Sequence, residues 1–316
     1  MLAATSWRTD LLEYIDGNWY IALAFNLVFF VGGRILSEAS APRAERRRAA
    51  ALLGAFAAPS ALLLIASLPW SLGIERMPWY NTFRSINRIE LAAALIAPFA
   101  GFITQPRGAY TRRGQVDPDA EPFDDPPPWP MRILKPLAFP LTLAYVSACF
   151  AGPLARPLER SVRYSDVGGA RWSDGIMLAS GESTSGAAAL ATALRSLGAN
   201  VDGERDICVA THASATGAEI WQLARYAAAH GCQWRYVRAD GGAGSVSGIP
   251  TPAVAQVADP GSGRQGGARR YIALLEASGD IIVVGDPSLG RLSLTNEAFA
   301  ARYSVISPAL ALRATP

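Results

Sequence analysis

Histidine, cysteine and lysine are scarce in this chain of 316 residues. It has two histidines and three cysteines, and lysine is nearly absent, so arginine carries the positive charge. Structural zinc needs four closely spaced ligands, and Cys149, Cys208 and Cys232 lack such neighbours, so we expect no metal and no other cofactor. The net charge of +3 is small and scattered, which argues against nucleic acid as a partner.

Charged residues are few as well. They make up 17% of the chain, whereas 50% of the residues are hydrophobic and the mean hydropathy is +0.17, which indicates a membrane. The N-terminus lacks the basic stretch and apolar core of a cleavable signal peptide, so the first apolar run is expected to be an anchor. Within a transmembrane region at 1–154 we expect four helical spans, at about 19–36, 49–74, 80–104 and 133–154. Three spans are the alternative, because the third carries Arg84, Arg88 and Glu90.

The clearest local pattern lies between Trp172 and Gly198. A polar, irregular run leads to Ser185, and the sequence then becomes a strong helix former that ends at Gly198 and has three leucines on one face, Leu190, Leu194 and Leu197. Ser185 is therefore expected at a helix N-terminus, where unpaired N–H groups and the helix dipole favour a thiolate or an oxyanion. A cysteine protease places its nucleophile at such a position.

This stretch resembles the opening of the peptidase C39 family, papain-like domains of bacteriocin-processing transporters and other bacterial proteins. The family pattern is roughly W-x-D-G-V-x-x-Q, then C-G-P-A-A and a helix; here 172–176 read Trp-Ser-Asp-Gly-Ile and 185–190 read Ser-Gly-Ala-Ala-Ala-Leu. The resemblance continues through an apolar helix at 220–229 and strands at 271–275 and 281–285. It implies an α+β papain-like C39-type domain at 172–316. The apolar runs before it add an α-helical membrane bundle of about four helices and a linker at 155–171 to the expected fold.

The departures from the family pattern fall on the catalytic positions. Ser185 stands in place of the nucleophilic Cys, and six positions earlier Ala179 stands in place of the Gln that stabilises the oxyanion. The general-base His, sixteen positions before the orienting Asp286, has become Arg270. The resemblance thus implies a degenerate site, in which Asp286 is expected to form an ion pair with Arg270.

General chemistry agrees with the loss of activity. A serine needs an adjacent base to act as a nucleophile, and arginine cannot accept a proton. The two histidines, His212 and His230, lie in a segment expected to be helical, away from the position of the base, and are expected to be ordinary, partly exposed residues. Ser185 is then expected to be the N-cap of its helix.

Cys208 and Cys232 are expected at the ends of two helices of one hairpin. The sequence is equally compatible with a disulfide between them and with two free buried thiols.

Arginine counts predict the orientation of the chain. The first and third loops hold more arginine than the N-terminus and the second loop, so they are expected in the cytoplasm. With four spans, the protein is then a multi-pass protein of the bacterial inner membrane whose C-terminal domain is periplasmic or extracellular. The acidic, proline-rich stretch at 117–130 is expected to be an extended connector, with a docking segment as the alternative.

The functional hypothesis is a membrane-anchored, non-catalytic C39-like protein (a pseudopeptidase) that acts as a binding or scaffolding subunit of a membrane complex. Its expected partners are the lipid bilayer and either a polypeptide ligand or other subunits. One alternative is a membrane-bound peptidase or hydrolase that uses Ser185. The other is a transport component, suggested by Arg84, Arg88 and Glu90 near the membrane.

Overall fold

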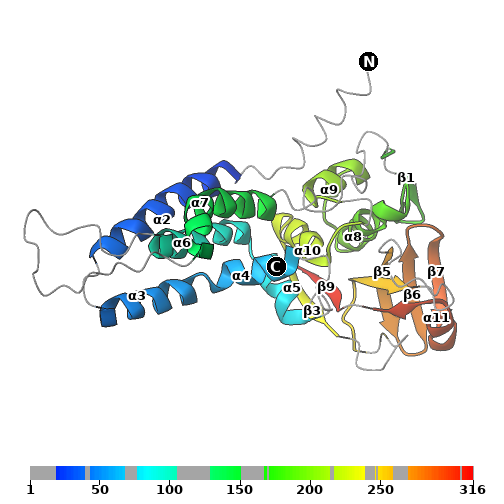
Figure 1. Cartoon of the computed structure of the whole chain (residues 1–316). Coiled ribbons are helices and arrows are strands. Elements are labelled where there is room, and N and C mark those ends of the chain that lie inside the picture. The colour runs from blue at the N-terminus through cyan, green and yellow to red at the C-terminus, as the bar shows by residue number, and fades with distance from the viewer. Residues whose placement is uncertain are drawn as a thin grey trace, which may run out of the picture. The chain divides into compact units, whose positions relative to one another are not determined.

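The chain forms two compact units in the computed structural model (Figure 1). The described residues are 19–39, 43–67, 77–104, 129–150, 167–168, 171–213, 217–238, 246, 248–258, 270–306 and 308–315. One unit, at 15–69 and 88–155, is helical; the other comprises 156–316 together with the earlier segments 1–14 and 70–87. Most of the predicted linker and the proline-rich stretch at 117–130 lie outside the described residues.

The helical unit consists of apolar helices separated by short breaks. Its elements are α2 (Trp19–Ala39), α3 (Arg43–Phe56), α4 (Ala58–Ser67), the 3-10 helix η2 (Ile89–Leu95), α6 (Ile96–Thr104) and α7 (Trp129–Phe150). Helix α7 continues through Pro136 and Pro140, which apolar helices tolerate when their neighbours satisfy the freed carbonyls. The axes of α3 and α4 meet at 45°.

Two glycines let α2 and α6 cross with their backbones in contact. A Cβ at Gly33 would lie 2.0 Å from the carbonyl oxygen of Pro98, and a Cβ at Gly101 would lie 2.0 Å from that of Phe30. Small residues at crossings allow such close backbone packing between apolar helices. Next to this crossing, the rings of Phe30 and Phe139 pack edge to face with their centroids 5.1 Å apart, which adds α7 to the cluster.

Only part of the predicted membrane topology has a counterpart in the described helices. One of them, at 20–37, is long and apolar enough to cross a membrane. Up to three crossings result if each bent pair counts as one span: α3 with α4, and α5 (Pro78–Ser85) with η2 and α6, a pair bent by 89°. The span predicted at 80–104 is therefore not one continuous helix, and four spans stay a prediction.

The second unit is an α+β domain built on an antiparallel sheet. The strand order is β3-β9-β4-β5-β6-β7, with β8 paired to β4. The strands are β3 (Cys232–Val237), β4 (Ala253–Ala258), β5 (Arg270–Ser278), β6 (Ile281–Asp286), β7 (Gly290–Thr295), β8 (Ser304–Val305) and β9 (Ala309–Ala314). A separate hairpin pairs β1 (Arg171–Ser173) with β2 (Ile176–Leu178). The helices are η5 (Glu182–Thr184), α8 (Ser185–Ser196), α9 (Glu204–Ala210), α10 (Ile220–Ala229) and α11 (Asn296–Arg302).

Strand β5 is buried on both faces, which explains its uninterrupted apolar sequence. Tyr271 and Ala273 belong to the cluster that α8 and α10 form on one face, whereas Ile272 and Leu274 pack with α11 on the other. A Cβ at Gly186, the second residue of α8, would lie 3.2 Å from the Tyr271 ring. Helix α8 therefore seats its N-terminal turn directly on β5.

Several predicted elements are confirmed. Helix α8 begins at Ser185 and is followed by Gly198 with a φ of +78°, α10 has the predicted bounds, and β5 and β6 cover the two predicted strands. The predicted helical hairpin is wrong at one end, because Cys232 is the first residue of β3. Helix α5 packs on α10 and β3 of the α+β domain, although it precedes them by more than 130 positions in the sequence.

Candidate functional site

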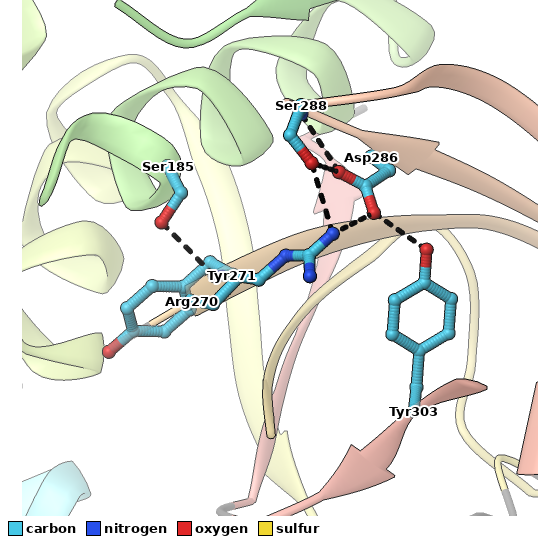
Figure 2. A network of polar contacts seen from close by, with 6 residues as sticks. All are labelled: Ser185, Arg270, Tyr271, Asp286, Ser288 and Tyr303. Atoms are coloured by element: carbon cyan, nitrogen blue, oxygen red, sulfur yellow. Dashed lines mark hydrogen bonds and ion pairs between the residues drawn. The ribbon is translucent and has the colours of Figure 1, made fainter. Parts of the chain in front are cut away.

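Ser185 lies at the start of α8 with its side chain turned to β5. Its hydroxyl oxygen accepts a hydrogen bond from the backbone N–H of Tyr271 at 3.2 Å, as Figure 2 shows, and the residue is 4% exposed. The Tyr271 phenol donates in turn to the carbonyl of Ala218 at 2.9 Å. The expected position at a helix N-terminus is thus confirmed, and the Ser185 hydroxyl ties α8 to β5.

The expectation that Ser185 caps its helix is wrong. The N-cap of α8 is Thr184, and Ser185 is already helical, with φ −56° and ψ −33°. The Thr184 hydroxyl bonds backward, accepting from the N–H of Gly181 at 3.1 Å and donating to its carbonyl at 2.9 Å. The chain enters α8 through the 3-10 turn η5, so the cap position falls one residue earlier than the sequence indicates.

Arg270 and Asp286 form the predicted ion pair. The Nη2 of Arg270, at the first position of β5, donates to Oδ2 of Asp286 at 2.6 Å and to the hydroxyl of Ser288 at 3.0 Å (Figure 2). Asp286, the last residue of β6, is fully buried, whereas the Arg270 side chain is 26% exposed. The guanidinium therefore closes the solvent side of a buried carboxylate.

Three further donors complete the shell of Asp286. Its Oδ1 accepts from the N–H of Ser288 at 2.8 Å and from the Ser288 hydroxyl at 2.6 Å, and its Oδ2 accepts from the Tyr303 hydroxyl at 2.6 Å. Burial alone would raise the pKa of Asp286, but the bonds from Ser288 and Tyr303 and the charge of Arg270 together hold it below its ordinary value. Asp286 is consequently an anion with every lone pair directed at a donor.

Tyr303 stays a neutral donor in this network. Burial raises the pKa of its phenol, and the hydrogen bond to Asp286 and the charge of that carboxylate raise it further. A catalytic Asp orients a base that must gain and lose a proton. Here the carboxylate instead binds a permanent cation and two hydroxyl groups, an arrangement that stabilises a fixed negative charge.

Ala179 offers only backbone groups to the site. Its N–H donates to the carbonyl of Pro287 at 2.9 Å, and its methyl group packs against the core. The loop that follows is held by Glu204, which is fully buried in the first turn of α9. The carboxylate of Glu204 accepts from the N–H of Ser180 at 2.7 Å and from its hydroxyl at 2.5 Å. This anchor fixes the path from Ala179 to Ser185.

The histidines belong to other elements. His230 follows α10, and its ring nitrogens lie 2.9 Å from the carbonyl of Tyr226 and 3.3 Å from Oδ2 of Asp202. His212 follows α9 and has a φ of +48°.

Cys208 and Cys232 are free, buried thiols, and burial together with the charge of Glu204 raises the pKa of Cys208 to about 12. Among the described residues, no group of three or more His, Cys, Asp or Glu side chains could hold a metal ion.

Sequence reasoning missed Ser288, Tyr303, Glu204 and Ser180. Ser288 carries a local signal, because a Ser two positions after an Asp is suited to bond back to its carboxylate. Glu204 follows Gly203 in the first turn of a short helix, where an acidic residue is favoured, but its pairing with Ser180 is not readable from spacing. Tyr303 reaches Asp286 only because the sheet brings α11 beneath β6.

Several solved structures are similar to this chain, and one of them is a peptidase domain. The peptidase domain of Streptococcus ComA, described as a bifunctional ABC transporter involved in a quorum-sensing pathway, is 17% identical; the match covers 42% of this chain and 93% of that chain, with a TM-score of 0.35. A score of that size is too low to establish a common fold. No protein-family model matches the chain. Curated proteins give no match either.

Proposed function

We propose that this chain is a membrane-anchored, C39-like protein without peptidase activity, whose α+β domain binds a polypeptide ligand or other subunits of a membrane complex. The observation that carries the proposal is the Arg270–Asp286 ion pair at the position where the family resemblance places the base and its orienting Asp. Arginine cannot take a proton from a nucleophile or give one to a leaving amine at neutral pH.

The other two catalytic positions support the same proposal. Ser185 has its hydroxyl oxygen engaged by the N–H of Tyr271, and Ala179 has no side-chain donor for an oxyanion. A shallow hollow of about 370 Å³ on α9, lined by Arg205, Asp206, Val209 and Ala210, includes none of these positions. We propose that the surface around the partly exposed Arg270 holds a polypeptide without cutting it, because the catalytic positions lack the groups that cleavage needs.

The rim of this surface suggests where a ligand would lie. Leu289, in the turn between β6 and β7, is 49% exposed and directly follows Ser288, whose hydroxyl accepts a hydrogen bond from Arg270. An exposed apolar side chain next to a fixed cation suits an extended peptide that offers an apolar residue and a carbonyl or carboxylate oxygen. The membrane anchor at 20–37 would hold this surface close to a membrane-borne partner.

A photoreactive residue in place of Leu289 tests the binding role in the full chain. On irradiation in native membranes, we expect a covalent adduct with a defined polypeptide, and its mass should equal the sum of the two intact chains. The matched control places the same photoreactive residue at Glu297, an exposed position on α11. Equal adducts at both positions, or adducts with truncated polypeptides at Leu289 alone, would contradict the proposal.

A further inference from the structure

Helix α5 belongs to the same compact unit as the α+β domain and has two unlike faces. Pro78 at its first position sets the helix start, since proline lacks only an N–H that no helical partner would use. Tyr80, Asn81 and Ser85 are buried, whereas Trp79 and Ile86 are 53% and 52% exposed. At 100° per residue, these two sets lie on opposite sides of the helix.

The buried side is docked on α10 and β3 by polar contacts. Arg225 of α10 donates through Nε at 3.0 Å and through Nη2 at 2.6 Å to the carbonyl of Arg84 in the last turn of α5. A helix C-terminus has carbonyls without helical partners and carries the negative end of the dipole, so a guanidinium is a suitable cap. Arg84 and Arg225 both lie over the ring of Trp221, 4.2 and 4.6 Å from its centre.

A second contact fixes the docked helix to the edge strand. The Ser85 hydroxyl donates to the carbonyl of Asn81 at 2.7 Å, so its oxygen accepts from the Tyr236 hydroxyl of β3 at 2.5 Å. Burial raises the pKa of Tyr236, which keeps it a neutral donor. Because α5 and α10 belong to one compact unit, they lie on the same side of any membrane that the chain crosses.

The exposed side has the composition of a membrane-interface helix. Trp79 and Ile86 are 53% and 52% exposed, and tryptophan prefers the level of the lipid headgroups. Two residues after Asn87 the apolar segment 89–104 begins, and together with α5 it forms a bent pair that is long and apolar enough for one membrane span.

We infer that α5 is an interfacial helix that holds the α+β domain at the surface of the lipid bilayer. Trp79 and Ile86 lie at the boundary between the lipid headgroups and the acyl chains, while Arg225 and Tyr236 form hydrogen bonds with the opposite side of the helix. The inference rests on the membrane attachment of the proposed function and is independent of its ligand. In this role α5 is neither part of a transmembrane span nor, through Arg84, part of a transport site.

Depth-dependent quenching tests the lipid contact in the full chain, reconstituted in vesicles of phosphatidylethanolamine and phosphatidylglycerol. A thiol-reactive fluorophore is placed at Trp79→Cys and, as the matched control, at Ser293→Cys, which is exposed on β7 at the other edge of the sheet from β3. The unsubstituted chain, labelled in parallel, gives the background from Cys149, Cys208 and Cys232. We expect spin-labelled lipid to cause a several-fold larger loss of fluorescence at position 79 than at 293, and aqueous iodide to cause the reverse. Equal quenching at both positions overturns the inference, as does a label at 79 that is shielded from both quenchers, because protein would then cover this face.

Crosslinking tests the docked side in the same vesicles. Ser85→Cys combined with Tyr236→Cys should react with a short bismaleimide, so that cleavage at a protease site inserted between 105 and 128 leaves the two fragments joined on a denaturing gel. Ser85→Cys combined with Ser293→Cys is the control and should give separate fragments. Separate fragments from the first pair would refute the docking of α5. Failure of the photocrosslink at Leu289 would leave both results unaffected, so the two proposals can fail independently.

Discussion

Replacing Arg270 by alanine tests how much its ion pair with Asp286 stabilises the fold. Asp286 accepts four hydrogen bonds, of which Arg270 supplies one and Ser288 and Tyr303 supply three. Breaking a buried ion pair by removing one partner costs about 3–5 kcal/mol when the remaining charge is left alone. Asp286 keeps three donors, and the 26% exposure of Arg270 lets water reach the vacated position. We therefore expect a loss of about 1–3 kcal/mol, the range of one charge-assisted hydrogen bond.

Hydrogen exchange measures this loss in the full chain, because the amides that pair β5 with β6 exchange only when that part of the sheet opens. A loss of about 1–3 kcal/mol corresponds to exchange that is roughly 5- to 150-fold faster. Arg291→Ala, an exposed arginine on β7, is the matched control and should change stability by less than about 0.5 kcal/mol. If the two variants exchange at the same rate, the ion pair contributes nothing and the argument for a fixed charge at this site is refuted.

The same pair makes a prediction about acid. The folded pKa of Asp286 is below its ordinary value, so its stabilising contribution is complete above the ordinary carboxylate pKa and is lost as the pH falls through the folded pKa. Removing the positive charge of Arg270 raises the pKa of Asp286, and the Arg270→Ala variant should therefore lose its β5–β6 protection at a higher pH than the parent. Protection curves that coincide on the pH axis would contradict this linkage.

Three further predictions concern other parts of the chain. Ser185→Cys should not generate peptidase activity, because a thiolate there would still have no group to protonate the leaving amine; measurable turnover by this variant would be the contrary result. Gly33→Ala should cost about 1–3 kcal/mol or more in thermal stability in detergent, since its Cβ would meet the carbonyl oxygen of Pro98 at 2.0 Å, whereas Gly32→Ala, with nothing within 4 Å, should be tolerated. Cys208 and Cys232 should resist maleimide in the folded chain, because both are buried and the pKa of Cys208 is raised to about 12, and should label fully without reductant once the chain is denatured.

Elements with a local signal were predictable from the sequence. Helix α8 follows from its leucine spacing and Gly198, and β5 from its apolar run. The partners of Asp286 were predictable only in part: Arg270 was reached through the family resemblance, but Tyr303 comes from the far end of α11 and has no pattern that marks it. The cap of α8 was misplaced by one residue because the 3-10 turn before it has no distinctive sequence.

Contacts between distant parts of the chain could not be predicted. Helix α5 reads as the start of an apolar span, yet Arg225 and Tyr236, which are 141 and 151 positions away from their partners, hold it on the α+β domain. No periodicity in the sequence of α5 predicts that it packs on the α+β domain. The half-exposed edge strand β3 was also missed, since its alternation of polar and aromatic residues gains meaning only when β9 pairs with it.

Peptide turnover tests the absence of catalysis most directly. The purified full chain is incubated with double-glycine-type and generic peptide substrates beside a Ser185→Ala variant, and the products are followed by mass spectrometry. We predict that neither protein cleaves any peptide above the uncatalysed background, since Ser185, Arg270 and Ala179 supply no activated nucleophile, no base and no side-chain donor for an oxyanion. Cleavage by the parent chain that disappears in Ser185→Ala would contradict this and identify the protein as a hydrolase.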